Sequence, residues 1–150
     1  MTTQQFTAEA TATFRRTGGW SVCLGPGGFL GRFYLRQAVS PVAELERRLG
    51  ILATCLGSAL TSALESAGIF NHGIRATLQC APHQKISSHP PVKLSVEGQL
   101  LVECEADQNT VQAYYEKRVR TDPLVLLLTQ EFQSMDVRVG VHSSAHIRIG

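Results

Sequence analysis

Cys55 is the residue of this sequence whose type and position best suit chemistry. It lies in the middle of a predicted helix, at the edge of a face of leucines. The thiolate is the reactive form of cysteine, and a neighbouring guanidinium makes a thiol easier to ionise. Glu44 and Arg48 share a helical stripe with Cys55 and are spaced to form an i,i+4 ion pair. Helical side chains lean towards the N-terminus, so Arg48 should point away from Cys55, and activation would call for an arginine from elsewhere.

The alternative interpretation of Cys55 is inert packing, because a free cysteine among leucines usually behaves as a small hydrophobic residue. We expect packing for Cys80 and Cys104, which continue the inward faces of predicted strands, and exposure for Cys23, which lies out of phase with its neighbours. The four cysteines lie far apart, with neither a Cys-x-x-Cys pair nor metal-ligand spacing. The sequence therefore predicts free thiols, no metal site and no cofactor.

Other familiar motifs are missing from the sequence. His142 and His146 are four residues apart in a strand-like pattern, where that spacing spans about 13 Å. The glycine-rich stretch 25–31 lacks the lysine of a phosphate-binding loop, and no Gly-x-Ser-x-Gly elbow of a serine hydrolase occurs. Cys55 therefore remains the main chemical candidate.

The bulk composition is that of a globular protein. The chain has 150 residues, of which 43% are hydrophobic and 17% charged, and its formal net charge is +2. Such a weak charge does not suggest nucleic-acid or membrane partners. The N-terminus lacks the pattern of a signal peptide, and we expect no apolar run that approaches the roughly 18–20 residues of a membrane span. We expect one cytoplasmic domain that spans residues 1–150.

The helix that carries Cys55 should be unusually long. Ser40 and Pro41 suit the N-cap and the first helical position, and Gly68 is the natural stop. The interval corresponds to about 27 residues, or about 40 Å. Its buried face is expected to consist of leucines at helical spacing: Leu45, Leu49, Leu52, Leu56 and Leu60.

A second stripe of small residues follows the opposite side of this helix: Gly50, Thr54, Gly57 and Thr61. A glycine inside a helix costs about 1 kcal/mol relative to alanine, so two on one face predict the close approach of another backbone. We expect the helix to be buried on both sides, and a partner subunit is one candidate for the second neighbour.

The remaining elements alternate in blocks. Strands are predicted at residues 6–14, 20–24, 29–39, 74–80, 92–104 and 135–141, and further helices at 107–119 and 124–132. Asp107 and Asp122 are placed as N-caps of the two later helices, and Pro123 follows the second cap. Blocks of strands without strict strand–helix alternation predict an α+β fold with antiparallel pairing.

Several of these strings resemble the OsmC/Ohr superfamily, the osmotically inducible and organic hydroperoxide resistance proteins. Residues 53–60 read ATCLGSAL and are similar to the family's Ala-Ala-Cys-Phe-x-x-Ala-Leu around its helix cysteine. Thr17-Gly18-Gly19 resembles the glycine pair after the first strand. Residues 115–117 and 122–125 resemble the segment around the family's Cys-Pro motif. The similarity, including the order of elements, spans nearly the whole chain.

The resemblance implies antiparallel sheets around a long central helix in an intertwined homodimer. It also implies a mechanism in which a helix thiolate attacks a peroxide, an arginine–glutamate pair activates it, and a second cysteine resolves the sulfenic acid. Cys55 matches the first cysteine, and Glu44 lies near the family's glutamate. Asp122 stands where the resolving cysteine would be, and Trp20 where peroxidase members carry arginine.

Three hypotheses follow from these observations. The first is an OsmC-like redox protein in which Cys55, with Arg48 and Glu44, reduces organic hydroperoxides under oxidative stress and an external thiol acts as reductant. The second is a non-catalytic, dimeric protein of the same fold that binds a small apolar ligand, with Trp20 and Asp122 as binding residues. The third is a structural or partner-binding domain with inert cysteines.

Overall fold

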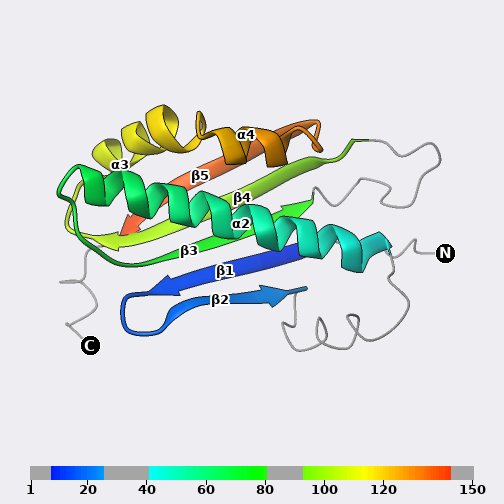
Figure 1. Cartoon of the computed structure of the whole chain (residues 1–150), viewed down its shortest axis with the longest axis horizontal. Helices are drawn as coiled ribbons and strands as arrows, with labels where there is room; N and C mark the ends of the chain where they lie inside the picture. Colours follow the sequence, from blue (N-terminus) through cyan, green and yellow to red (C-terminus); the bar gives the residue numbers. More distant parts are fainter. Residues whose placement is uncertain (1–7, 26–40, 81–92, 143–150) are drawn as a thin grey trace.

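The described part of the chain forms one five-stranded sheet with helices on one face (Figure 1). The computed structural model describes residues 8–25, 41–80 and 93–142. The strands are β1 (Glu9–Arg15), β2 (Gly19–Leu24), β3 (Asn71–Cys80), β4 (Ser95–Cys104) and β5 (Ser134–His142). The helices are α2 (Pro41–Ser66), α3 (Gln108–Tyr114), the π-helix η1 (Tyr115–Val119) and α4 (Pro123–Thr129). The α+β fold class predicted from the sequence is confirmed.

The sheet has the order β2-β1-β3-β4-β5. The first four strands pair antiparallel, as expected, but β5 pairs parallel to β4. The expectation of antiparallel pairing throughout was therefore wrong for the last strand. The chain leaves β4, crosses the helical face through α3, η1 and α4, and enters β5 at the end where β4 began, and such a crossover connection produces a parallel pair.

Two predicted features lie outside the described residues. The strand predicted at residues 29–39 and the Ser40 N-cap both belong to the segment between β2 and α2. The described part of the sheet is a single layer, in place of the several sheets expected from the resemblance.

Helix α2 lies across the sheet and forms the centre of the core (Figure 1). Its fully buried leucines are Leu49, Leu52, Leu56, Leu60 and Leu64. The helix ends as predicted, because Gly68 has a φ of +77° and the Ile69 N–H donates to the Leu64 carbonyl at 2.8 Å. The leucine spacing and the glycine stop thus located this helix correctly.

The two glycines of the small-residue stripe of α2 are covered by side chains of β2. A Cβ atom added to Gly57 would overlap the Trp20 ring, and one added to Gly50 would lie 2.9 Å from Leu24 Cδ2. The expected close neighbour is therefore a set of large side chains from the same chain, not another backbone. Trp20 needs the space that a glycine leaves, which explains why the stripe accepts residues unfavourable to a helix.

The segment after β4 begins as predicted and then departs from a regular helix. The Asp107 side chain accepts a hydrogen bond from the Thr110 N–H at 2.7 Å and caps α3. From Tyr115 the chain widens into the π-helix η1, in which the Arg120 N–H donates to the Tyr115 carbonyl five residues earlier. Tyr115 and Val119 remain buried. A wide turn of this kind is not encoded in hydrophobic spacing, and π-turns often accompany functional sites.

Helix α2 also has the length and composition of a membrane span. Within the segment Val42–Ser66, an 18-residue window has a mean hydropathy of 1.3, whereas we expected no membrane span from the sequence. Half of the relevant window is buried inside the molecule, against the sheet. We therefore interpret α2 as the core helix of a globular fold.

Candidate functional site

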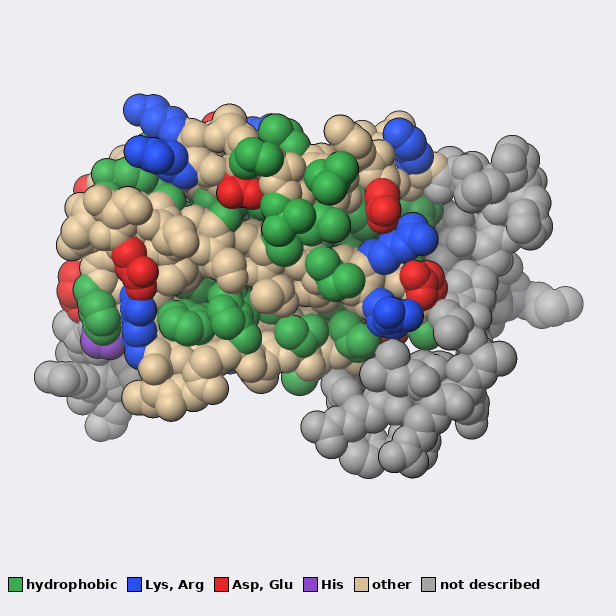
Figure 2. All heavy atoms as spheres, in the orientation of Figure 1, with side chains coloured by type: hydrophobic (Ala, Val, Ile, Leu, Met, Phe, Trp, Pro, Cys, Tyr) green, Lys and Arg blue, Asp and Glu red, His purple; other side chains and the backbone are tan. Residues whose placement is uncertain are grey.

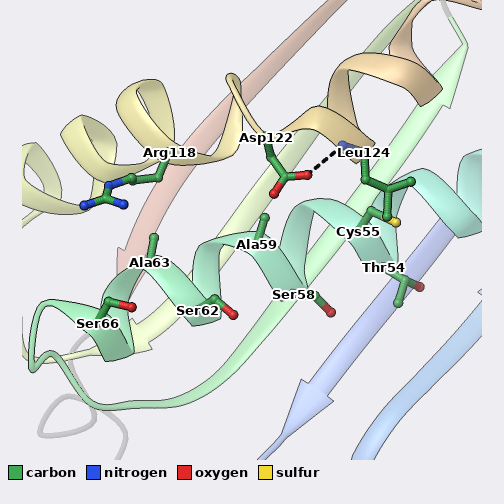
Figure 3. A pocket seen from close by; sticks show the side chains of 10 residues that line it. All are labelled: Thr54, Cys55, Ser58, Ala59, Ser62, Ala63, Ser66, Arg118, Asp122 and Leu124. Carbon is green, nitrogen blue, oxygen red and sulfur yellow. Dashed lines mark hydrogen bonds between the residues drawn. The ribbon is translucent and has the colours of Figure 1, made fainter.

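Cys55 lies on the side of α2 that faces away from the sheet. Its side chain is partly exposed, and it borders two cavities of about 480 Å³ and about 400 Å³. Figure 3 shows the residues that line the larger one. Both volumes suit a small molecule. The thiol at the centre of the sequence hypothesis is therefore open to a ligand and is not sealed in hydrocarbon.

The larger cavity, which we call the serine groove, runs along the second half of α2. Serine hydroxyls recur along one edge of the groove at one-turn intervals, whereas Ala59 and Ala63 point towards Asp122 and Arg118 (Figure 3). Its lining residues are Thr54, Cys55, Ser58, Ala59, Ser62, Ala63, Ser66, Arg118, Asp122 and Leu124. The groove thus has hydroxyls, a thiol, a carboxylate and a guanidinium within one space.

The smaller cavity, the apolar cavity, lies on the other side of Cys55. It is lined by Val22, Leu24, Arg47, Gly50, Ile51, Thr54 and Cys55. Close to it, hydrophobic side chains gather on the surface over α4 and the first half of α2 (Figure 2). The exposed members, which we call the apolar patch, are Val22, Ile51, Leu124, Leu126 and Leu127. Cys55 therefore lies between an apolar surface and a polar groove.

The environment of Cys55 favours the neutral thiol. Partial burial raises the pKa of the thiol, and the Asp122 carboxylate raises it further. A negative charge next to sulfur disfavours the thiolate, which is the nucleophilic form. At neutral pH, Cys55 is therefore mostly protonated, and its nucleophilicity should increase as the pH rises.

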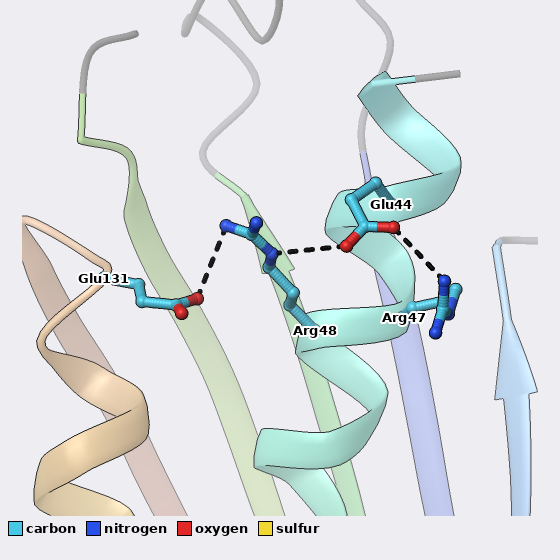
Figure 4. A network of polar contacts seen from close by, with 4 residues as sticks. All are labelled: Glu44, Arg47, Arg48 and Glu131. Carbon is cyan, nitrogen blue, oxygen red and sulfur yellow. Dashed lines mark hydrogen bonds and ion pairs between the residues drawn. The ribbon is translucent and has the colours of Figure 1, made fainter. Parts of the chain in front are cut away.

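Arg48 and Glu44 form the ion pair that their spacing predicts, at 3.6 Å (Figure 4). Glu44 also contacts Arg47 at 3.3 Å, and Arg48 contacts Glu131 at 3.4 Å. All four side chains are about half exposed, so each contact contributes at most about 1 kcal/mol. Arg48 is held between two carboxylates, and neither Arg48 nor Glu44 lines a cavity at Cys55.

Trp20 and Asp122, the two predicted binding residues, have different surroundings. The Trp20 ring lies 5.3 Å from the Phe14 ring and packs on Gly57, and it lines neither cavity at Cys55. Asp122 lines the serine groove and also caps α4, because its side chain accepts from the Leu124 and Val125 N–H groups. The Asp-Pro sequence revealed the cap, and only the resemblance, which puts Asp122 at the position of a resolving cysteine, implied that this carboxylate lies beside Cys55.

Arg118 is a residue of the site that sequence reasoning missed. It comes from η1 and extends over the Ala63 and Ser66 end of the groove (Figure 3). Within the described part of the chain it has neither an ion-pair nor a hydrogen-bond partner, whereas Arg16, Arg48 and Arg120 are all paired. The only sequence signal was its four-residue spacing from Asp122, and that spacing crosses the break between two helices.

The described residues contain no group of three or more His, Cys, Asp or Glu side chains that could hold a metal ion. Cys80 and Cys104 are buried and Cys23 is exposed, as predicted, and all four thiols are free. Neither buried thiol lines a cavity at Cys55, so among these cysteines none is in place to form a disulfide with it.

The whole arrangement is similar to a solved structure described as an OsmC like protein from Mycoplasma pneumoniae. The TM-score is 0.53, and the match covers 95% of this chain and 99% of the other at 10% sequence identity. The fold is OsmC-like. At this identity the likeness concerns the fold alone. No protein-family model matches the chain, and no curated protein matches its sequence.

Within this OsmC-like fold the long helix presents the Cys55 sulfur to two unlike cavities. The apolar cavity can take a hydrocarbon group, and the serine groove can take a polar one. Among the described residues that line these cavities, the cations are Arg118 in the serine groove and Arg47 in the apolar cavity. Each comes from a position well away from Cys55 along the helices.

Proposed function

We propose that this protein is a thiol-dependent reductase of organic hydroperoxides and that Cys55 is its reacting residue. The observation that carries the proposal is the position of the Cys55 sulfur, partly exposed at the junction of an apolar cavity and a polar groove. An alkyl hydroperoxide has an apolar body and a polar O–O–H group, so the two cavities can orient its O–O bond towards sulfur. The OsmC-like fold supports the same reading.

The reaction consumes one thiolate and one hydroperoxide. Sulfur attacks the terminal oxygen, the O–O bond breaks, and the alkoxide leaves as an alcohol after it takes up a proton. Cys55 becomes a sulfenic acid. Because no second cysteine lies at the groove among the described residues, an external thiol must return it to the reduced form. The rate should rise with pH, since the thiolate fraction of Cys55 rises.

A second copy of the chain is the partner that this surface suits. The apolar patch carries protruding leucines on α4, and Leu127 is 60% exposed, while the apolar cavity is a recess on the same face. A knob and a hole on one face can fit each other across a two-fold axis. Light scattering on the purified protein should give a dimer, and Leu127→Arg should weaken it. A monomeric wild type at tens of micromolar would reject this assembly.

Consumption of cumene hydroperoxide tests the proposed reaction. Wild-type protein with excess dithiothreitol should consume the hydroperoxide, and Cys55→Ser should reduce the rate to the background of dithiothreitol alone. Cys23→Ser, which removes an exposed thiol that lines neither cavity at Cys55, should keep the wild-type rate. Equal rates for wild type and Cys55→Ser would end the proposal.

One observation favours a second function, the binding of a small ligand without catalysis. Burial and Asp122 both raise the pKa of the Cys55 thiol, whereas a catalytic thiol usually has a lowered pKa. In that case native mass spectrometry of the protein from cells should show a bound molecule in wild type and in Cys55→Ser alike. A large apolar substitution at Ala59, on the groove floor, should expel that molecule.

A further inference from the structure

The serine groove contains an unpaired cation at the end opposite Cys55. Arg118 has no partner within the described part of the chain, and its guanidinium extends over Ala63 and Ser66 (Figure 3). Ala63 lies eight residues after Cys55 on the same helix, which corresponds to about 12 Å along the axis. A planar guanidinium without a carboxylate partner is suited to bind a carboxylate of a ligand in two hydrogen bonds.

The groove between these two ends has both apolar and polar parts. Ser58 and Ser62 place hydroxyls along one edge at one-turn intervals, and Ala59 leaves room above the helix (Figure 3). Hydroxyls can donate to and accept from a peptide-like backbone. The cavity of about 480 Å³ is large enough for a molecule of three residues or so.

The charge at the sulfur end differs from the charge at the other end. Asp122 lies beside Cys55, and this carboxylate repels an anionic group there. A ligand with one carboxylate is therefore oriented, with its anion at Arg118 and its neutral part at Cys55. The groove thus distinguishes the two ends of an extended molecule.

We propose that the serine groove binds the reductant, a low-molecular-weight thiol with a carboxylate about 10 Å from its sulfur. This inference rests on the proposed function for its first step. Cys55–SOH reacts with R–SH to give Cys55–S–S–R and water. A second R–SH then releases Cys55–SH and R–S–S–R, so that one hydroperoxide oxidises two thiols to a disulfide and yields one alcohol and one water. Arg118 is a binding residue for the carboxylate.

Glutathione and its diethyl ester provide a matched pair of probes, because the ester lacks the free carboxylates. The protein, in a Cys23→Ser background, is oxidised with one equivalent of cumene hydroperoxide and mixed with either thiol. Intact mass then follows the mixed disulfide at Cys55, with rates expressed per thiolate. The wild-type protein should form the mixed disulfide about tenfold faster with glutathione than with the diethyl ester, which corresponds to one charge-assisted hydrogen bond. Arg118→Gln should remove the preference, and Lys117→Gln, a neighbouring exposed cation outside the groove, should keep it.

A second arm separates this inference from the proposed function. Oxidised glutathione and its tetraethyl ester are mixed with the reduced protein, so that Cys55–SH exchanges with a disulfide and no hydroperoxide is needed. If hydroperoxide never oxidises Cys55 but the exchange shows an Arg118-dependent preference, the proposed function fails and the thiol site stands. A preference that Arg118→Gln leaves unchanged, or no preference in either arm, overturns the inference.

Discussion

The two sides of α2 differ in what their side chains contact. The buried side consists of leucines that contact the sheet, and the five at its centre are essentially inaccessible. The open side carries Cys55, Ser58 and Ser62, which border a cavity completed by η1 and α4. One helix thus serves as the spine of the core and as the floor of a site. The buried side can be recognised from the leucine spacing of α2 alone. The cavity on the open side also needs residues of η1 and α4, which lie more than fifty positions further along the chain.

The difference explains where chemistry can occur on this fold. Leucine packing fixes the height and rotation of α2, so the position of the Cys55 sulfur is set by side chains on the far side of the helix. The exposed groove residues, such as Ser58, can then be replaced without loss of the core. Substitutions on the two sides should therefore have opposite consequences, large for stability on one and large for reactivity on the other.

The largest effect should come from Leu56→Ala on the buried side. Leu56 is fully buried, and removal of its side chain should lower the free energy of unfolding by about 2–5 kcal/mol, because it leaves a cavity. Ser58→Ala, two residues away on the open side, should change it by less than about 0.5 kcal/mol. Urea denaturation followed by circular dichroism measures both. Similar losses for the two variants would contradict the division of the helix.

Gly57→Ala should have the next largest effect. The new methyl group would overlap the Trp20 ring, so we expect destabilisation of about 1–3 kcal/mol despite the better helix propensity of alanine. Trp20 is the only tryptophan in the chain, so its fluorescence reports the displacement directly. A stabilised variant with unchanged fluorescence would show that Trp20 does not need this space.

Asp122→Asn should have a smaller effect, and only on reactivity. Asparagine is an equally good N-cap, so α4 should keep its stability. Removal of the carboxylate removes one of the two causes that raise the pKa of Cys55, so the pH midpoint of its alkylation should move down and the rate at pH 7 should increase. Asp107→Asn, which changes the cap of α3 in the same way, should leave the midpoint unchanged. A midpoint that does not move in Asp122→Asn would show that burial alone raises the pKa.

Much of the fold could be predicted from local patterns. Leucine spacing located α2, Gly68 its end, and Asp107 and Asp122 the caps of α3 and α4. The parallel placement of β5 could not be read in this way, because it depends on how the chain crosses the sheet after β4.

The candidate site was only partly predictable for the same reason. Local patterns identified Cys55 and the Asp122 cap separately, and only the resemblance, with Asp122 at the position of a resolving cysteine, implied their proximity. That proximity arises from the packing of α4 over α2. The ion pair of Glu44 and Arg48 was correct as a local contact, yet its place on the helix keeps it outside both cavities. Arg118 depends on a π-turn, which no hydrophobic period encodes.

The most direct test of the account is to map where one equivalent of hydroperoxide oxidises the protein. Cys23 is more exposed than Cys55, so exposure alone predicts oxidation at Cys23. Our account holds that the two cavities direct the hydroperoxide to the helix thiol. Trapping with a sulfenic-acid reagent, followed by peptide mass spectrometry, should therefore label Cys55 first. Label found at Cys23 and absent from Cys55 would contradict the account.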